Sequence, residues 1–103
     1  MVSIGKLKKV LELRKAGKQL QKSLGQELVS GSGSRGAVTV KLDGNQKVQE
    51  VLIDPALLTP DRKADVERGV AEAFGDAQKK LQEIMQAKLK AGELKLPDLE
   101  GLQ

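Results

Sequence analysis

Apolar residues recur at every second position in only one stretch of the chain, from Gly36 to Asp54. Its first half, Val38 to Leu42, alternates apolar with polar residues, which is the period of a half-buried strand. The sequence Asp43-Gly44-Asn45 follows and is rich in residues that tolerate a positive φ, as hairpin turns require. A second apolar run from Val48 to Ile53 completes the pattern of a β-hairpin.

The second strand of this hairpin has apolar residues on both sides. At a period of two, Val51 and Ile53 share one face, whereas Val48 and Leu52 share the other. A helix can cover one side, and something else should cover the other. The Gly/Ser-containing segment from Glu27 to about Gly33 reads as an irregular edge strand before the hairpin, so we expect a three-stranded antiparallel meander.

A long helical pattern precedes the strands. It should begin at Ser3, which can act as the N-cap, and end at about Glu27. At about 1.5 Å per residue such a helix is nearly 40 Å long, so part of it must project or pack on a second subunit. One arc of its surface is apolar, and it consists of Val10, Leu13, Leu20, Leu24 and Leu28. Ile4, Leu7 and Leu11 lie instead under a separate basic arc.

A second helical pattern follows the hairpin. Asp54-Pro55 should end the last strand, and Ala56 to Leu58 should pack back on the sheet. Thr59 is the predicted N-cap with Pro60 at the first helical position, and the helix should end at Ala91-Gly92. Its amphipathic stripe has small residues at the centre and consists of Val66, Val70, Ala73, Phe74, Ala77, Leu81, Ile84 and Leu89.

These elements predict a two-layer α+β fold, in which long N- and C-terminal helices flank a three-stranded antiparallel sheet. Residues 1–92 form one domain, and the leucine-containing tail 93–103 should be flexible or dock on a partner subunit. Only one residue of the 103 is aromatic, so the core of a single chain is thin and we expect a homodimer. The predicted interface residues are Val48, Leu52, Phe74, Leu81 and Ile84.

The net charge of +4 conceals a strong asymmetry along the chain. Residues 1–22 carry seven Lys or Arg against one acid, whereas the remainder carries 11 basic against 13 acidic residues. The basic character is therefore concentrated in the first helix, where it points to a polyanionic partner.

Several kinds of chemistry find no support in the sequence. The chain has no His and no Cys, which removes the commonest general base, metal ligands and thiol chemistry. Gly31, Gly33 and Gly36 form a literal G-x-G-x-x-G, but a helix precedes it and strands follow, the reverse of a dinucleotide-binding motif. We therefore expect no enzyme activity, no cofactor and no metal. No stretch reads as a signal peptide or a membrane span, so a cytoplasmic protein is expected.

Three phrases in register resemble the YbaB/EbfC family of bacterial nucleoid-associated proteins. They are Gly36-Ala-Val-Thr-Val-Lys-Leu-Asp-Gly44, Val51-Leu-Ile-Asp-Pro-Ala-Leu-Leu58 and Val70-Ala-Glu-Ala-Phe-Gly-Asp-Ala77. With the flanking helices the resemblance covers about residues 4–92. It implies a helix, three antiparallel strands and a helix, paired into a homodimer with protruding helices that binds DNA at the nucleoid. The sequence departs from the family in a first helix rich in Lys and Leu, and in Gly75 where Asn is usual.

Together these observations predict a nucleoid-associated protein that grips duplex DNA mainly through its phosphates, with a role in nucleoid organisation or gene regulation. Stacking on single strands is disfavoured because Phe74 belongs to the core stripe. The alternative is a structural or adaptor module whose long helices bind a protein partner or a membrane surface. The candidate DNA-binding residues are Lys8, Arg14, Lys15, Lys18, Lys22, Lys79, Lys80 and Lys88.

Overall fold

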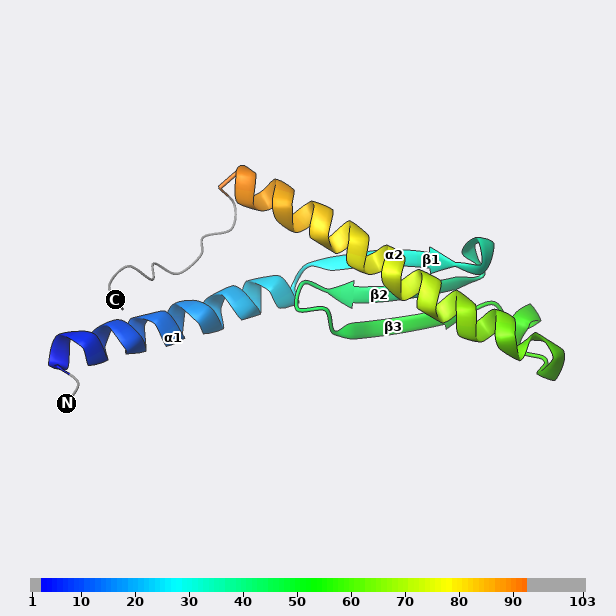
Figure 1. Ribbon diagram of the computed structural model, residues 1–103, viewed down its shortest axis with the longest axis horizontal. Helices are drawn as coiled ribbons and strands as arrows, with labels where there is room; N and C mark the ends of the chain where they lie inside the picture. The colour runs from blue at the N-terminus through cyan, green and yellow to red at the C-terminus, as the bar shows by residue number, and fades with distance from the viewer. Residues whose placement is uncertain (1–2, 93–103) are drawn as a thin grey trace.

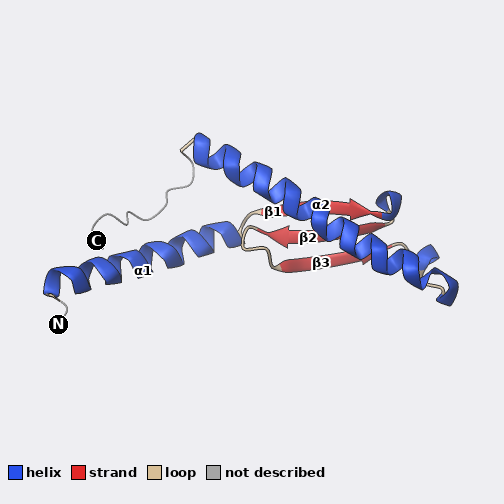
Figure 2. Ribbon diagram, viewed as in Figure 1, coloured by secondary structure: helices blue, strands red, loops and turns tan. Residues whose placement is uncertain are grey.

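The computed structural model describes residues 3–92, which form two long helices and one small sheet (Figures 1 and 2). The three strands are antiparallel in the order β1-β2-β3, so β2 is central. The predicted α+β fold is confirmed. Its main elements in chain order are α1 (Ile4–Gly25), β1 (Leu28–Gly33), β2 (Val38–Asp43), β3 (Val48–Ile53) and α2 (Lys63–Lys90).

The core lies between α2 and the two strands that it crosses, β1 and β2. Val38, Val40 and Leu42 on β2 are at most 1% exposed and point at α2, as their alternation predicts. On β1 the inward positions include Gly31 and Gly33. A Cβ atom at Gly31 would collide with the backbone of Ala73 and Ala77, and one at Gly33 with that of Gly69. The glycines that mimic a phosphate-binding motif therefore let α2 lie directly on β1.

Strand β3 lies largely outside this core, although its last residue, Ile53, packs against it. Val48, Val51 and Leu52 are 43–49% exposed, because α2 crosses β1 and β2 and leaves β3 uncovered. A register shift between Lys41 and Leu42 pairs Val48 with Leu42, while Leu52 pairs with Thr39. Cross-strand partners share a face, so Val48 and Leu52 lie on opposite faces. The prediction that Val48 and Leu52 share a face is wrong, because the bulge interrupts the alternation of side chains along β3.

The entry into α2 also differs from the prediction. Pro60–Arg62 form a separate 3-10 turn, η3, and α2 begins at Lys63. Thr59 makes no capping hydrogen bond; its side chain bonds to the Asp61 carboxylate instead and lowers the pKa of Asp61. In the preceding 3-10 turn η2 (Pro55–Leu57), Leu57 packs back on the core as expected. The following residue, Leu58, is 61% exposed and does not pack on the core.

Helix α1 contributes nothing to the core. It has no buried residue and extends away from the sheet (Figure 1). The prediction that part of this helix projects is confirmed, because α1 leaves from the end of the sheet and packs on none of the described strands. Helix α1 and the C-terminal half of α2 project toward the same end of the molecule, like two diverging arms (Figure 1).

Candidate nucleic-acid interface

Helix α1 is a free-standing basic arm. The Ser3 side chain accepts a hydrogen bond from the Lys6 N–H at 3.2 Å and caps its first turn, as predicted. The arm carries seven basic residues against one acid. Both the apolar and the basic side of α1 stay accessible to solvent, because no other element in the described part of the chain covers this helix.

The base of this arm is held by the β2–β3 turn. The Gly44 N–H donates to the Leu24 carbonyl at 2.8 Å, and the Asn45 side-chain amide donates to the Gln21 carbonyl at 2.9 Å. Both carbonyls lie in the last five residues of α1, and that of Leu24 is among the four that lack an i+4 partner within the helix. The hairpin turn therefore caps α1 and sets the direction in which the arm leaves the sheet.

The turn itself is built around Asp43, a carboxylate that is only 5% exposed. It accepts hydrogen bonds from the Asn45 N–H at 2.8 Å, the Lys47 N–H at 3.0 Å and the Gln49 side-chain amide at 3.0 Å. Sequence reasoning identified this turn but not its second task of capping the arm, because the partner carbonyls lie in a distant segment.

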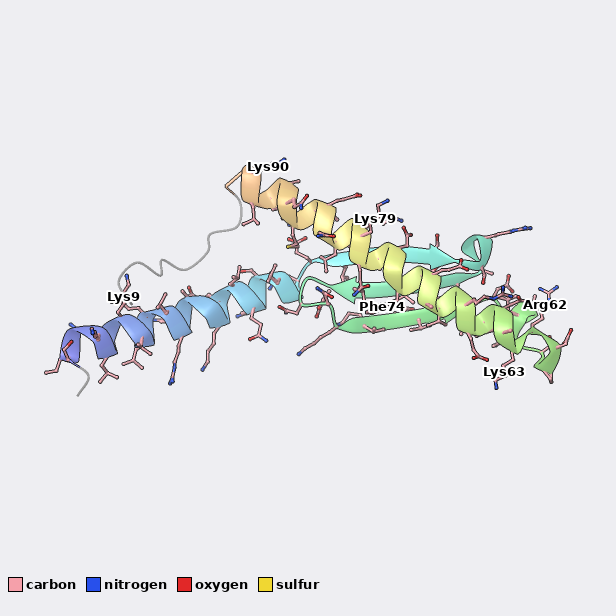
Figure 3. The ribbon with its side chains drawn as sticks, in the orientation of Figure 1. Lys9, Arg62, Lys63, Phe74, Lys79 and Lys90 are labelled. Carbon is pink, nitrogen blue, oxygen red and sulfur yellow. The ribbon has the colours of Figure 1, made fainter. Side chains whose placement is uncertain are left out.

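The five predicted DNA-binding residues of α1 are all exposed, and Figure 3 shows long side chains along the arm. None forms an ion pair with another of residues 3–92. Along the axis, Lys8 and Lys22 are about 21 Å apart at 1.5 Å per residue, the length of about six phosphate steps along one DNA strand. The residues are Lys8, Arg14, Lys15, Lys18 and Lys22.

The three candidates on α2 differ from one another. Lys80 contacts the Asp76 carboxylate at 3.1 Å and the Ser30 carbonyl at 3.3 Å, and Lys88 pairs with Glu27 at the start of the sheet. Both side chains tie α2 to the β1 edge. Lys79 points away from the sheet (Figure 3) and makes no such contact within the described residues. Of these three, Lys79 is the one whose charge remains available.

The five residues predicted to form the dimer interface fall into two groups, one packed in the core of its own chain and one exposed. Leu81 is 4% exposed and belongs to the core of its own chain, and Phe74 is partly buried against the same core. Val48, Leu52 and Ile84 are 49%, 46% and 36% exposed, so these side chains keep apolar surface that another molecule can cover.

The described residues include no group of three or more acidic, His or Cys side chains arranged to hold a metal ion. Across the same part of the chain, neither helix is apolar enough over a sufficient length to cross a membrane. The feature that stands out is the positive charge on a projecting helix.

The α-β-β-β-α order of elements places the chain in a known class of protein. The model of the YbaB/EbfC DNA-binding family matches residues 3–93, nearly the whole chain. The protein belongs to this family, as its sequence phrases predict.

Full-length relatives agree with this assignment. A nucleoid-associated protein of Afipia carboxidovorans is 34% identical over 98 residues, covering 93% of this chain and 93% of the relative. A nucleoid-associated protein of Rhodopseudomonas palustris is 37% identical over 101 residues, covering 96% of this chain and 95% of the relative.

Among solved structures, an uncharacterised protein of Helicobacter pylori has the same fold. It matches with a TM-score of 0.66 at 19% identity, covering 91% of this chain and all of that one. Such a likeness concerns the arrangement of helices and strands alone.

Proposed function

We propose that the protein binds duplex DNA through the exposed basic face of α1 and acts as a nucleoid-associated protein. The observation that carries the proposal is a projecting helix with five cations free of internal ion pairs among residues 3–92. Helices of soluble proteins normally bury one face, so an uncovered arm of this charge indicates a surface that functions in binding. Membership of the YbaB/EbfC DNA-binding family supports the same conclusion.

Binding proceeds mainly through phosphates. Lysine ammonium groups spaced along a helix follow a phosphate backbone and release its condensed counterions, which favours association and makes it dependent on salt. Arg14 adds a planar fork that can hold one phosphate with two hydrogen bonds. Contacts of this kind position the protein on DNA with modest sequence preference, which suits a role in nucleoid organisation or gene regulation.

The second helix adds less than its lysine content indicates. Lys80 and Lys88 hold α2 against the β1 edge, so using them on DNA would break internal contacts. Lys79 is free of such a contact in the described part of the chain. The DNA surface therefore consists of the arm, joined by Lys79.

We also propose that the protein acts as a homodimer. Among residues 3–92, ten large apolar side chains are exposed and eight apolar residues form the buried core, so a single chain leaves much apolar surface to cover. A dimer also doubles the number of basic arms, and linked binding sites raise the overall affinity for one DNA molecule.

The test of the DNA surface is charge reversal at Lys15, Lys18 and Lys22. The triple Lys→Glu variant should lower the affinity for a labelled duplex by about two orders of magnitude, and lower the slope of log affinity against log salt by about three, because three phosphate contacts are lost. Fluorescence anisotropy across a salt series measures both quantities. Circular dichroism and light scattering check that fold and mass are unchanged.

A matched control carries the same charge change elsewhere. Lys41, Lys47 and Lys63 lie outside α1, and their reversal to Glu should reduce binding far less. Equal loss in both triple variants would show that overall charge, rather than the α1 face, governs binding. No duplex binding by the natural chain even at low salt would refute the proposal.

A second candidate function is docking on a protein partner or a membrane surface. It is favoured by Ile4, Leu7 and Leu11, which are 82%, 53% and 54% exposed beside the lysines of α1. Binding of this kind depends on apolar burial and would persist at high salt. A protein that ignores duplex DNA but binds anionic vesicles or a partner at high salt would support this candidate instead.

A further inference from the structure

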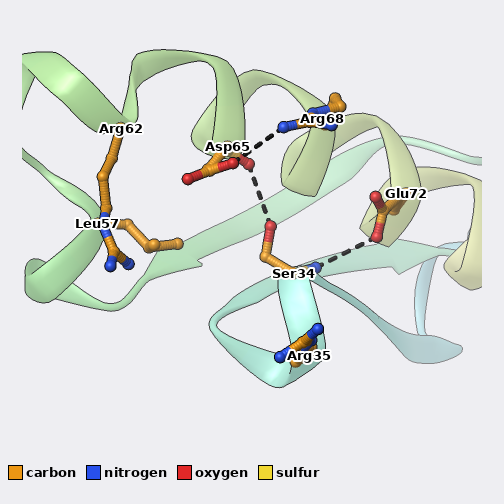
Figure 4. A pocket seen from close by; sticks show the side chains of 7 residues that line it. All are labelled: Ser34, Arg35, Leu57, Arg62, Asp65, Arg68 and Glu72. Atoms are coloured by element: carbon orange, nitrogen blue, oxygen red, sulfur yellow. Dashed lines mark hydrogen bonds and ion pairs between the residues drawn. The ribbon is translucent and has the colours of Figure 1, made fainter.

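The end of the molecule opposite the α1 arm contains a cavity of about 500 Å³ (Figure 4). It lies between the β1–β2 connection, the two 3-10 turns before α2, and the first turns of α2. Three of its seven lining side chains are arginines, and each comes from a different element. The lining residues are Ser34, Arg35, Leu57, Arg62, Asp65, Arg68 and Glu72.

An unusual turn places Arg35 at the cavity. Ser34, Arg35 and Gly36, which form the 3-10 turn η1, have φ values of 48°, 58° and 90°. Side chains disfavour this left-handed conformation, so contacts must hold it. The Ser34 hydroxyl donates to the Asp65 carbonyl at 3.1 Å, and the Ser34 N–H donates to the Glu72 carboxylate at 3.3 Å (Figure 4). The turn is thereby docked on α2 with its arginine beside the cavity.

The acidic residues of the lining already have partners. The Asp65 carboxylate contacts the Arg68 guanidinium at 3.0 Å, and the Glu72 carboxylate accepts from the Ser34 N–H. Arg35 and Arg62 make no ion pair or hydrogen bond through their side chains with any of residues 3–92. The cavity therefore offers two unpaired guanidinium groups, whose planar donor forks match phosphate oxygens.

We propose that this cavity binds a backbone phosphate of nucleic acid, as a second contact remote from the α1 arm. This inference rests on the proposed DNA-binding function and extends it. Arg35 and Arg62 are exposed, and only Leu57 of the lining is buried. A free phosphate compound is normally enclosed by its site, whereas a phosphate on a polymer approaches from solvent and stays largely exposed. The lining of this cavity is mostly exposed, so it fits a phosphate on a polymer rather than a free phosphate compound.

Two adjacent residues provide a matched test. Arg62 lines the cavity, whereas Lys63 does not, and their side chains point in opposite directions (Figure 3). Arg62→Gln and Lys63→Gln remove the same charge at the same end of the molecule. The Arg35→Gln/Arg62→Gln double variant should lower the slope of log affinity against log salt for duplex DNA by about one, because one phosphate contact is lost, and Arg62→Gln alone should lower it by part of that amount. Lys63→Gln should leave the slope unchanged.

The result that overturns the inference is a double variant whose slope and affinity equal those of Lys63→Gln while the natural chain binds DNA normally. That result leaves the α1 proposal intact. If the natural chain binds no duplex, both proposals fail together. Circular dichroism of each variant verifies the fold. Arg62→Lys keeps the charge but lacks the planar fork, so it should restore the slope and only part of the affinity.

Titration with inorganic pyrophosphate separates the two sources of phosphate. Amide NMR signals of Ser34, Arg35 and Glu72 should shift when a short duplex is added and respond weakly to pyrophosphate alone. Saturable binding of pyrophosphate at these residues with no response to duplex would contradict the assignment to a nucleic-acid backbone.

Discussion

At the scale of single residues, one carboxylate joins the outer strand to the helix above it. Asp76 on α2 accepts a hydrogen bond from the Ser32 N–H of β1 at 3.0 Å and contacts the Lys80 ammonium at 3.1 Å. The hydrogen bond from Ser32, followed by the contact with Lys80, holds the pKa of Asp76 below its ordinary value of 3.8. The ionised form is therefore the one that the fold favours.

This carboxylate makes stability depend on acidity in a defined direction. A pKa lowered by folding contributes stability above the ordinary value of 3.8, and that contribution is lost as the pH falls below it toward the folded value. Asp76→Asn should lower the urea midpoint at about pH 7 and show a smaller further loss at about pH 3 than the natural chain. Urea unfolding at both pH values measures this.

Glu83→Gln serves as the control for Asp76→Asn. Glu83 is exposed on the same helix and pairs with no other residue in the described segment, so its amide variant should follow the natural chain at both pH values. Equal pH dependence for the Asp76 variant and the natural chain would show that this carboxylate is not linked to folding. The chain has no histidine, so no side chain titrates with an ordinary pKa between 5 and 8.

At the scale of elements, contact between α2 and β1 depends on missing side chains. Gly31 and Gly33 face Gly69, Ala73 and Ala77, and the strand and helix backbones touch. The sequence shows the small residues of both segments, but their correspondence appears only when the helix is laid across the strand. The glycine motif is thus explained by packing, a role that its resemblance to a phosphate loop conceals.

Two glycine substitutions distinguish packing from helix propensity. Gly31→Ala adds a methyl group against the α2 backbone and should destabilise the protein by about 1–3 kcal/mol. Gly17→Ala adds the same group on α1, where nothing lies within 4 Å. It should raise helix content slightly and leave global unfolding unchanged, since α1 buries nothing. Chemical denaturation followed by circular dichroism tests both, and an unchanged Gly31→Ala midpoint would contradict the close packing.

Element types and order follow from periodicity, but partners do not. The alternation of β2, the stripe of α2 and the Ser3 cap of α1 are local patterns, and the structure confirms them. Which surface covers which is decided by long-range contacts. Amphipathicity could not show that, among the described elements, α2 covers the sheet and α1 does not. The period of two could not anticipate the bulge that moves Val48 to the other face of β3.

At the scale of the whole molecule, the chain is far from spherical. Its extents are 64 × 31 × 20 Å and its radius of gyration is 19.3 Å, against about 13 Å for a compact domain of this length. The α1 arm accounts for much of the difference. Such a shape leaves apolar side chains uncovered, which is the basis of the proposed homodimer.

A charge on the exposed strand tests that homodimer. Leu52→Glu should weaken self-association by about 100-fold or more, because an unpaired charge buried at an interface costs several kcal/mol. Leu28→Glu, on the opposite edge strand, is the control and should leave association unchanged. Sedimentation over a concentration series measures the constants. A natural chain that stays monomeric at all concentrations would refute the dimer.

The sequence predicts the basic face of α1 at one end of the molecule but not the arginine-lined cavity at the other end. The basic face of α1 is local, so seven basic residues within 22 reveal it directly. Lys80 and Lys88 look equivalent to those lysines in charge alone. The partner of Lys80, Asp76, stands four residues earlier on the same helix and is readable from the sequence, whereas Glu27, the partner of Lys88, lies in a distant segment. The arginine-lined cavity joins residues 35, 62 and 68, which only the folded chain brings together.

The isolation of α1 has a consequence for dynamics. A helix that buries no face takes its stability from local hydrogen bonds, its Ser3 cap and the turn at its base, and such helices are marginal in water. We expect helix–coil exchange of the arm to be uncoupled from global unfolding, and its amides to exchange with solvent before those of the core. In the proposed mode of binding, DNA selects the helical form of the arm and must offset the cost of ordering its unfolded part. The affinity expected for DNA thus depends on how much of the arm is already helical before DNA arrives.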